Sequence, residues 1–262
     1  MEKKYGKYTA DQLLQLSKYL RSLPELQAKW QVLALDNPTG LQEALKPPFF
    51  WSAIYELSFL HQSAALTFLS GLTEIALDAK AKKDPEQHLL DTIRHDLSSL
   101  DEMPDFELPE GFEERHVIGV WYAQIKTIES IWYYGVPLND LVENIKDGDD
   151  TALIKAVKID RSIVSCPPIA DRIARAEMIS DEKFFIKLQN ALRGKPKKPK
   201  DRYGPLRYIL MALDQDGVLD QLSINERYTL FCEELGLYPH NTADPARSLH
   251  QFIQRWKSEQ ST

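Results

Sequence analysis

The sequence is short of the residues that build disulfide frameworks and phosphate-binding loops. Only two cysteines, Cys166 and Cys232, occur among 262 residues, so we expect both to be thiols in a reducing compartment. Glycine is also scarce, at 11 residues, and no Gly-x-Gly or Gly-x-x-x-x-Gly-Lys pattern is present. Dinucleotide-binding folds and P-loop folds therefore lack their main signature in this chain.

A secretory or membrane-spanning segment is also missing from the pattern. The lysines near the N-terminus are followed by polar, amphipathic sequence rather than by the apolar core of a signal peptide. The most apolar stretch, residues 49–77, contains Glu56, His61 and Glu74, and ionisable groups are costly at membrane depth. We therefore predict a buried helix there, and a cytoplasmic protein with no membrane partner.

Charge is unevenly distributed along the chain. The total of 32 Lys and Arg against 39 Asp and Glu gives −7, which argues against a protein that coats nucleic acids with its whole surface. Residues 1–148 carry 14 basic and 23 acidic residues, net −9, whereas residues 149–262 carry 18 and 16, net +2. We expect two domains with this boundary, the first acidic and the second mildly basic.

The periodicity of apolar residues predicts an all-α fold, because positions three and four apart recur throughout. We expect a multi-helix bundle with a long central helix at about 49–80 and a smaller C-terminal helical subdomain. A capping box at Thr9–Gln12 starts the first helix, Pro24 suits the start of a second, and no strand pair is predicted. Further helices are predicted at about 85–100, 112–134, 138–146, 151–158, 168–179, 182–193, 203–213, 224–235 and 245–258.

The most uneven segment is a basic one. Residues 183–207 hold nine Lys and Arg against Asp201 alone, and prolines break their centre into a Lys/Pro linker at 194–202. The last helix has an apolar face and an opposite face suited to phosphate or base edges. The connection before it, residues 236–244, is longer than a compact helix-turn-helix allows. The residues that we predict to bind nucleic acid are Lys195, Lys197, Lys198, Lys200, Arg202, Arg247, Gln251 and Arg255.

Two carboxylates on the central helix suggest a pocket. Glu56 and Glu74 belong to a stripe of serine, threonine and glutamate where a fully exposed face would carry Lys and Arg. The stripe fits either a polar-lined pocket with an acid of raised pKa, or a narrow solvent strip at a close helix crossing. We favour the second interpretation.

Other reactive groups lack the geometry that chemistry needs. Cys166 precedes a helix start that would favour its thiolate, but no family signature places a base beside it. The pairs Asp91/His95 and Glu113/His116 have ligand-like spacing, yet the helical period turns them away from the apolar stripes. We therefore expect no catalytic residue, no metal and no cofactor.

Three functional hypotheses follow. The first is a helical interaction or regulatory protein without catalytic activity, whose two differently charged parts meet a protein partner. The second is a nucleic-acid-binding regulator that uses the basic linker and the last helix to bind DNA or RNA. The third is an enzyme with a polar pocket around Glu56 and Glu74.

Overall fold

A computed structural model describes residues 3–36, 59, 63, 83–84, 87–88, 91, 114–196, 202–240 and 243–260. Helices dominate these ranges, and a single two-stranded hairpin is the only sheet in them. The predicted all-α bundle is thus confirmed. Within the same ranges, no helix combines the length and the apolar character needed to cross a membrane. Most of the predicted central helix at 49–80 lies outside the described residues.

The N-terminus forms a hairpin that leads into the first helix. Strands β1 (Lys4–Tyr5) and β2 (Tyr8–Thr9) pair antiparallel, so the expectation of no strand pair was wrong. Strands of two residues are too short to show an alternating pattern in the sequence. The capping box is confirmed: the Thr9 amide donates to Gln12 Oε1 at 2.9 Å, and the Gln12 amide donates to Thr9 Oγ1 at 3.1 Å.

The first helix, α1 (Ala10–Asp36), is longer than predicted. It runs through Pro24, which therefore does not begin a second helix. Proline removes one backbone donor from a helix, and here the residues on both sides stay helical despite that loss.

The later helices match the predicted ranges closely. Gly135 follows the first of them with a φ of +79°, which is the left-handed conformation that glycine adopts after a helix. A second capping box, of Ser223 with Glu226, starts α13. The elements are α7 (Glu114–Tyr134), α8 (Leu138–Lys146), α9 (Asp150–Ile159), the 3₁₀ helix η2 (Arg161–Ser165), α10 (Pro167–Met178), α11 (Glu182–Arg193), α12 (Gly204–Gln215), α13 (Ile224–Tyr228), the π-helix η3 (Thr229–Glu234) and α14 (Pro245–Gln260).

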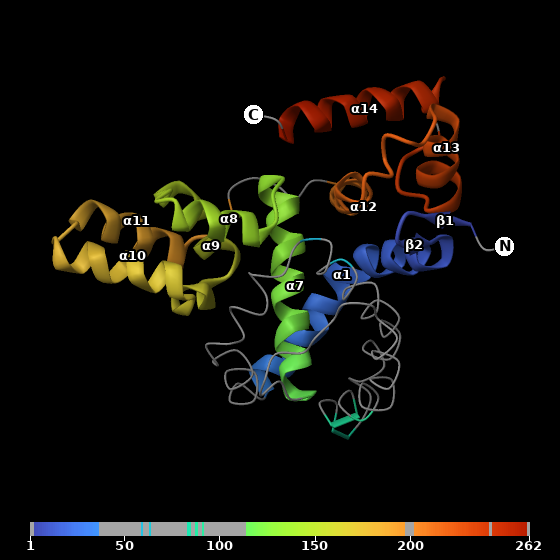
Figure 1. Cartoon of the computed structure of the whole chain (residues 1–262). Coiled ribbons are helices and arrows are strands. Elements are labelled where there is room, and N and C mark those ends of the chain that lie inside the picture. Colours follow the sequence, from blue (N-terminus) through green and yellow to red (C-terminus); the bar gives the residue numbers. More distant parts are fainter. Residues whose placement is uncertain are drawn as a thin grey trace.

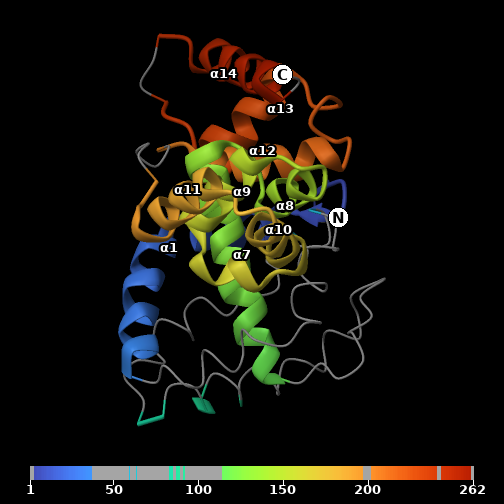
Figure 2. The ribbon, with the colours of Figure 1, turned by 90° about the vertical axis from the view of Figure 1, so that its left-hand side faces the viewer.

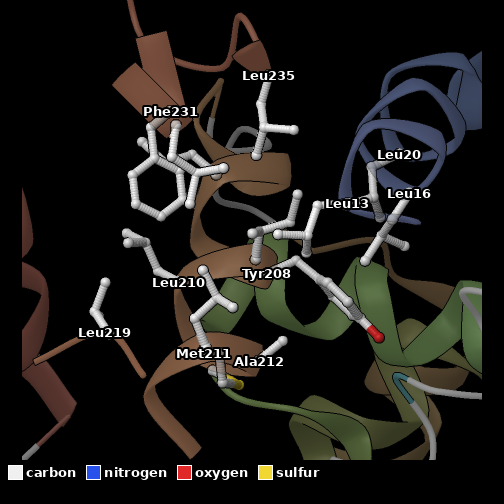
Figure 3. Packing of buried hydrophobic residues seen from close by; sticks show 14 of the residues in the cluster. Leu13, Leu16, Leu20, Tyr208, Leu210, Met211, Ala212, Leu219, Phe231 and Leu235 are labelled. Atoms are coloured by element: carbon white, nitrogen blue, oxygen red, sulfur yellow. The ribbon is translucent and has the colours of Figure 1, made fainter. Parts of the chain in front are cut away.

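One hydrophobic cluster joins the two ends of the chain. Leu13, Leu16 and Leu20 of α1 lie beside α12, as Figure 3 shows. At the centre of this contact, Tyr208 packs its ring 5.2 Å from that of Phe59, and its hydroxyl lies 3.0 Å from Ser63 Oγ. The cluster also takes in buried residues of α7, η3 and α14, and the partly buried Tyr228 of α13 packs against it.

A second hydrophobic cluster consists of α8, α9, η2, α10 and α11. These helices form a lobe beside one end of α7, whereas α14 lies at one end of the molecule over α12 and α13 (Figure 1, Figure 2). Ile145 and Ala152 both belong to the second cluster, so the chain packs continuously across Gly148. The N-terminal helix, in turn, packs with the C-terminal helices in the first cluster.

Candidate functional site: a cationic surface on the C-terminal helices

The last helix presents the polar stripe that its period predicts. Leu249, Ile253 and Trp256 are buried in the first cluster. Arg247, Gln251 and Arg255 are exposed, and their spacing of four places them along one side of α14.

An aromatic cluster brings the end of the basic linker against α14. Tyr203, at the N-cap of α12, stacks on Tyr238 with ring centroids 5.5 Å apart, and its ring lies 5.2 Å from that of Phe252 on α14. The Tyr238 hydroxyl and Ser248 Oγ are 2.9 Å apart. Residues almost fifty positions apart in the sequence are therefore held in direct contact.

Two arginines stack on this aromatic cluster. The Arg202 guanidinium lies 4.5 Å from the centre of the Tyr203 ring, and that of Arg207 lies 5.4 Å from the centre of the Phe252 ring. Both distances are within the range of cation–π attraction. Stacking restricts the two side chains before any ligand arrives, which lowers the entropy lost on binding.

Arg255 completes the same surface. It follows Phe252 by three positions and precedes Glu259 by four, so the three residues form one stripe on α14. Glu259 pairs with Arg207 at 3.0 Å, which shows that this stripe faces the start of α12. We call Arg202, Arg207, Arg247, Gln251 and Arg255 the cationic surface.

The cationic surface keeps positive charge after its ion pairs are counted. Glu259 compensates Arg207, and Asp244 accepts a hydrogen bond from the backbone amide of Arg247 at 3.0 Å as the N-cap of α14. In the described part of the chain, no carboxylate forms an ion pair with Arg202 or Arg255. Exposed guanidinium groups of this kind suit phosphate oxygens, which they contact with two parallel hydrogen bonds.

The structure places the predicted nucleic-acid-binding residues in three groups. Arg247, Gln251 and Arg255 are exposed along one side of α14, and Arg202 lies over the ring of Tyr203, which contacts Phe252 of the same helix. Lys195 is exposed at the other end of the linker, just after α11. The remaining predicted residues, Lys197, Lys198 and Lys200, lie outside the described residues, as do the pocket candidates Glu56 and Glu74.

Arg207 is a residue of this surface that the predicted site did not include. It belongs to the basic segment 183–207, but its position on α12 gave no reason to place it beside α14. The sequence feature that could have pointed to a basic partner here is Phe252. Its aromatic side chain flanks the polar stripe of α14 and can bind a cation on its ring.

Burial decides the state of the two cysteines. Cys166 is the N-cap residue of α10 and is buried. Loss of solvation raises its pKa to about 12, so the helix dipole does not produce the thiolate that its position would favour. Cys232 is buried in the first cluster, and loss of solvation raises its pKa to about 11.

The structure describes only part of the two carboxylate–histidine pairs with metal-ligand spacing. Asp91 is exposed, and its Oδ1 accepts a hydrogen bond from the side-chain Nε2 of Gln87 at 2.7 Å. His95 and Glu113 lie outside the described residues. Among the residues that the structure describes, no three His, Cys, Asp or Glu side chains converge as metal ligands do.

No protein-family model, curated protein or solved structure matches this chain. Its function is therefore argued from the chemistry of its surfaces.

Proposed function

We propose that this protein is a non-catalytic binding protein that holds the phosphate backbone of a nucleic acid on its cationic surface. The observation that carries the proposal is the packing of Tyr203, which stacks on Tyr238 and meets Phe252 edge to face. This packing holds the end of the basic segment against α14. Because guanidinium groups of this surface contact phosphates rather than base edges, the proposal is of binding that depends little on sequence.

The expected salt dependence of nucleic-acid binding follows from counterion release. Each cation that neutralises a phosphate of duplex DNA adds about 0.9 to the slope of log K against log salt. Arg202, Arg247 and Arg255 together contribute about 2.7, which is an affinity loss of about 40-fold between 50 and 200 mM salt. The linker lysines, Lys197, Lys198 and Lys200, add to this value where they also contact phosphates.

Fluorescence anisotropy with labelled single-stranded and double-stranded DNA and RNA tests the proposal. We expect salt-sensitive binding by the natural protein, and a slope smaller by about 2.7 in the variant R202Q/R247Q/R255Q. The matched control is R175Q/K183Q/K187Q, which removes three exposed positive charges from α10 and α11. Absence of binding to all four probes at low salt, or an equal loss in the control, contradicts the proposal.

The tip of the α10–α11 hairpin favours protein association as a second candidate function. Met178, Ile179 and Ile186 are 85%, 72% and 60% exposed, and exposed apolar side chains in one region mark protein contacts. The exposed charges around them balance, which suits contact with a second copy of the chain because a two-fold interface sets a surface against itself. These charges are Arg175, Lys183 and Lys187 against Asp171, Glu177 and Glu182.

Sedimentation over a wide concentration range tests the second candidate. The natural protein should dimerise as concentration rises, and the variant M178S/I179S/I186S should stay monomeric. Ile224 on α13 is 46% exposed, so I224S is the control and should dimerise like the natural protein. A natural protein that stays monomeric throughout rejects this candidate.

A further inference from the structure

A cleft lies between the N-terminal hairpin and the loop that joins α12 to α13. Its volume is about 510 Å³, which falls within the range of small-molecule sites. Lys4 and Lys7 line one side, and Val218 and Leu222 contribute apolar surface. The cleft does not involve the cationic surface, and the inference drawn from it does not depend on the proposed function.

The hairpin is fixed in place, so its lysines stand on a rigid support. The Lys7 backbone amide donates to Asp216 Oδ2 at 2.8 Å, and the Tyr5 hydroxyl donates to Glu234 Oε2 at 3.0 Å. Gly6 has a φ of +62°, and a Cβ atom there would lie 1.9 Å from Asp216 Oδ2 and 2.5 Å from Val218 Cγ2. Only glycine permits this close approach.

The cleft keeps two positive charges available. In the described part of the chain, neither the Lys4 nor the Lys7 ammonium has an ion-pair partner. The carboxylates at the cleft are engaged: Asp216 accepts the Lys7 amide, and Glu226 Oε2 accepts from the Ser223 amide at 2.8 Å and hydroxyl at 2.7 Å. These two carboxylates keep their charge, so the three lysines and two carboxylates of the lining leave one net positive charge. The Lys4 and Lys7 ammonium groups are the donors that remain for a ligand, and they suit an anionic group.

One further side chain offers a directional contact. The side-chain Nε2 of Gln221 donates a hydrogen bond to the Gly217 carbonyl oxygen at 2.9 Å, and this bond orients the side chain. Its carbonyl oxygen then remains to accept a hydrogen bond from a ligand hydroxyl or amine group.

We propose that this cleft binds an organic phosphate of nucleotide size. The phosphate lies between the Lys4 and Lys7 ammonium groups, and the organic part covers Val218 and Leu222. Nucleotides and sugar phosphates share this chemistry, so AMP, ribose 5-phosphate and inorganic phosphate are the probes that separate them.

Calorimetric titration of the full chain at low salt tests the proposal. We expect AMP or ribose 5-phosphate to bind more tightly than inorganic phosphate, and K4Q/K7Q to weaken that binding at least tenfold. The control K18Q/R161Q changes two exposed basic residues, one on α1 and one on η2, and should bind as the natural protein does. Tighter binding of AMP than of ribose 5-phosphate identifies a nucleotide, and the reverse identifies a sugar phosphate.

Three outcomes overturn the proposal. They are binding of neither organic probe, equal binding of inorganic and organic phosphate, and unchanged binding by K4Q/K7Q. Because both lysine side chains are exposed, K4Q/K7Q should fold, which an unchanged thermal unfolding midpoint verifies. R202Q/R247Q/R255Q should retain the binding of the organic probe, so failure of the nucleic-acid proposal and failure of this one are distinguishable.

Discussion

Arg172 joins three helices of the α8–α11 lobe, and its replacement by alanine tests how the lobe is held together. Its Nε and Nη2 atoms donate to the two carboxylate oxygens of Asp150, both at 2.8 Å. Nη2 also lies 3.5 Å from Asp181, and the guanidinium carbon lies 4.2 Å from the centre of the Phe184 ring. One side chain therefore links α9, α10 and α11.

The cost of removing this side chain follows from its contacts. Hydrogen bonds between charged groups contribute about 1.5–3 kcal/mol, and the lower value applies because Asp150 is 41% exposed. Stacking on Phe184 adds about 0.5–1 kcal/mol. We expect R172A to lose about 2–2.5 kcal/mol of stability, and R172K to lose about 1 kcal/mol because lysine keeps the charge without the two-pronged geometry.

Hydrogen exchange measured by mass spectrometry reads this loss helix by helix. A loss of about 2–2.5 kcal/mol corresponds to exchange about 30 to 70 times faster in α9, α10 and α11 of R172A. Exchange in α14, which belongs to the first cluster, should change much less. Equal acceleration of the lobe and α14 would refute the local role of Arg172. A D150A/R172A double variant whose loss equals the sum of the two single losses would refute the pairing itself.

Two further changes test other parts of the structure. Asp160 is buried, and loss of solvation raises its carboxyl pKa above the ordinary value of 3.8 although Ser162 hydrogen bonds oppose the shift. The folded protein therefore holds the Asp160 proton more tightly than the unfolded chain does. The free energy of unfolding falls as pH rises from the pKa of Asp160 in the unfolded chain to its higher pKa in the folded protein. Urea unfolding should show that D160N, which retains a capping side chain, lacks the fall in stability with pH that Asp160 causes. A pH profile of stability identical to that of the natural protein contradicts this prediction. Gly6→Ala should cost more than Gly217→Ala, because at Gly217 φ is +69° and no described atom lies within 4 Å of an added Cβ. The latter change should cost only about 1–2 kcal/mol, and equal losses in urea unfolding would count against the close approach at Gly6.

The candidate surfaces were only partly predictable. The stripe of Arg247, Gln251 and Arg255 follows from the period of α14 alone, because the apolar residues between them fix which side is buried. Its proximity to Arg202 and Arg207 does not follow, since Tyr203 and Phe252 are distant in sequence and carry no pairing signal. The lysine cleft was missed because it depends on a hairpin of two-residue strands and on the close packing of Gly6.

Local chemistry in the sequence determined where most helices begin and end. Capping boxes, prolines and the spacing of apolar residues act within a few positions, so they can be read without knowing the fold. The tertiary structure alone decided which segments share a core. The leucines of α1 pack with α12. Because the hydrophobic effect is not directional, an apolar face in the sequence shows that a helix is buried but not which helix covers it. Packing in the first cluster also set Arg202 beside α14, and packing in the second cluster buried Cys166. The surroundings of a charge or a thiol depend on neighbours that only the folded chain brings together.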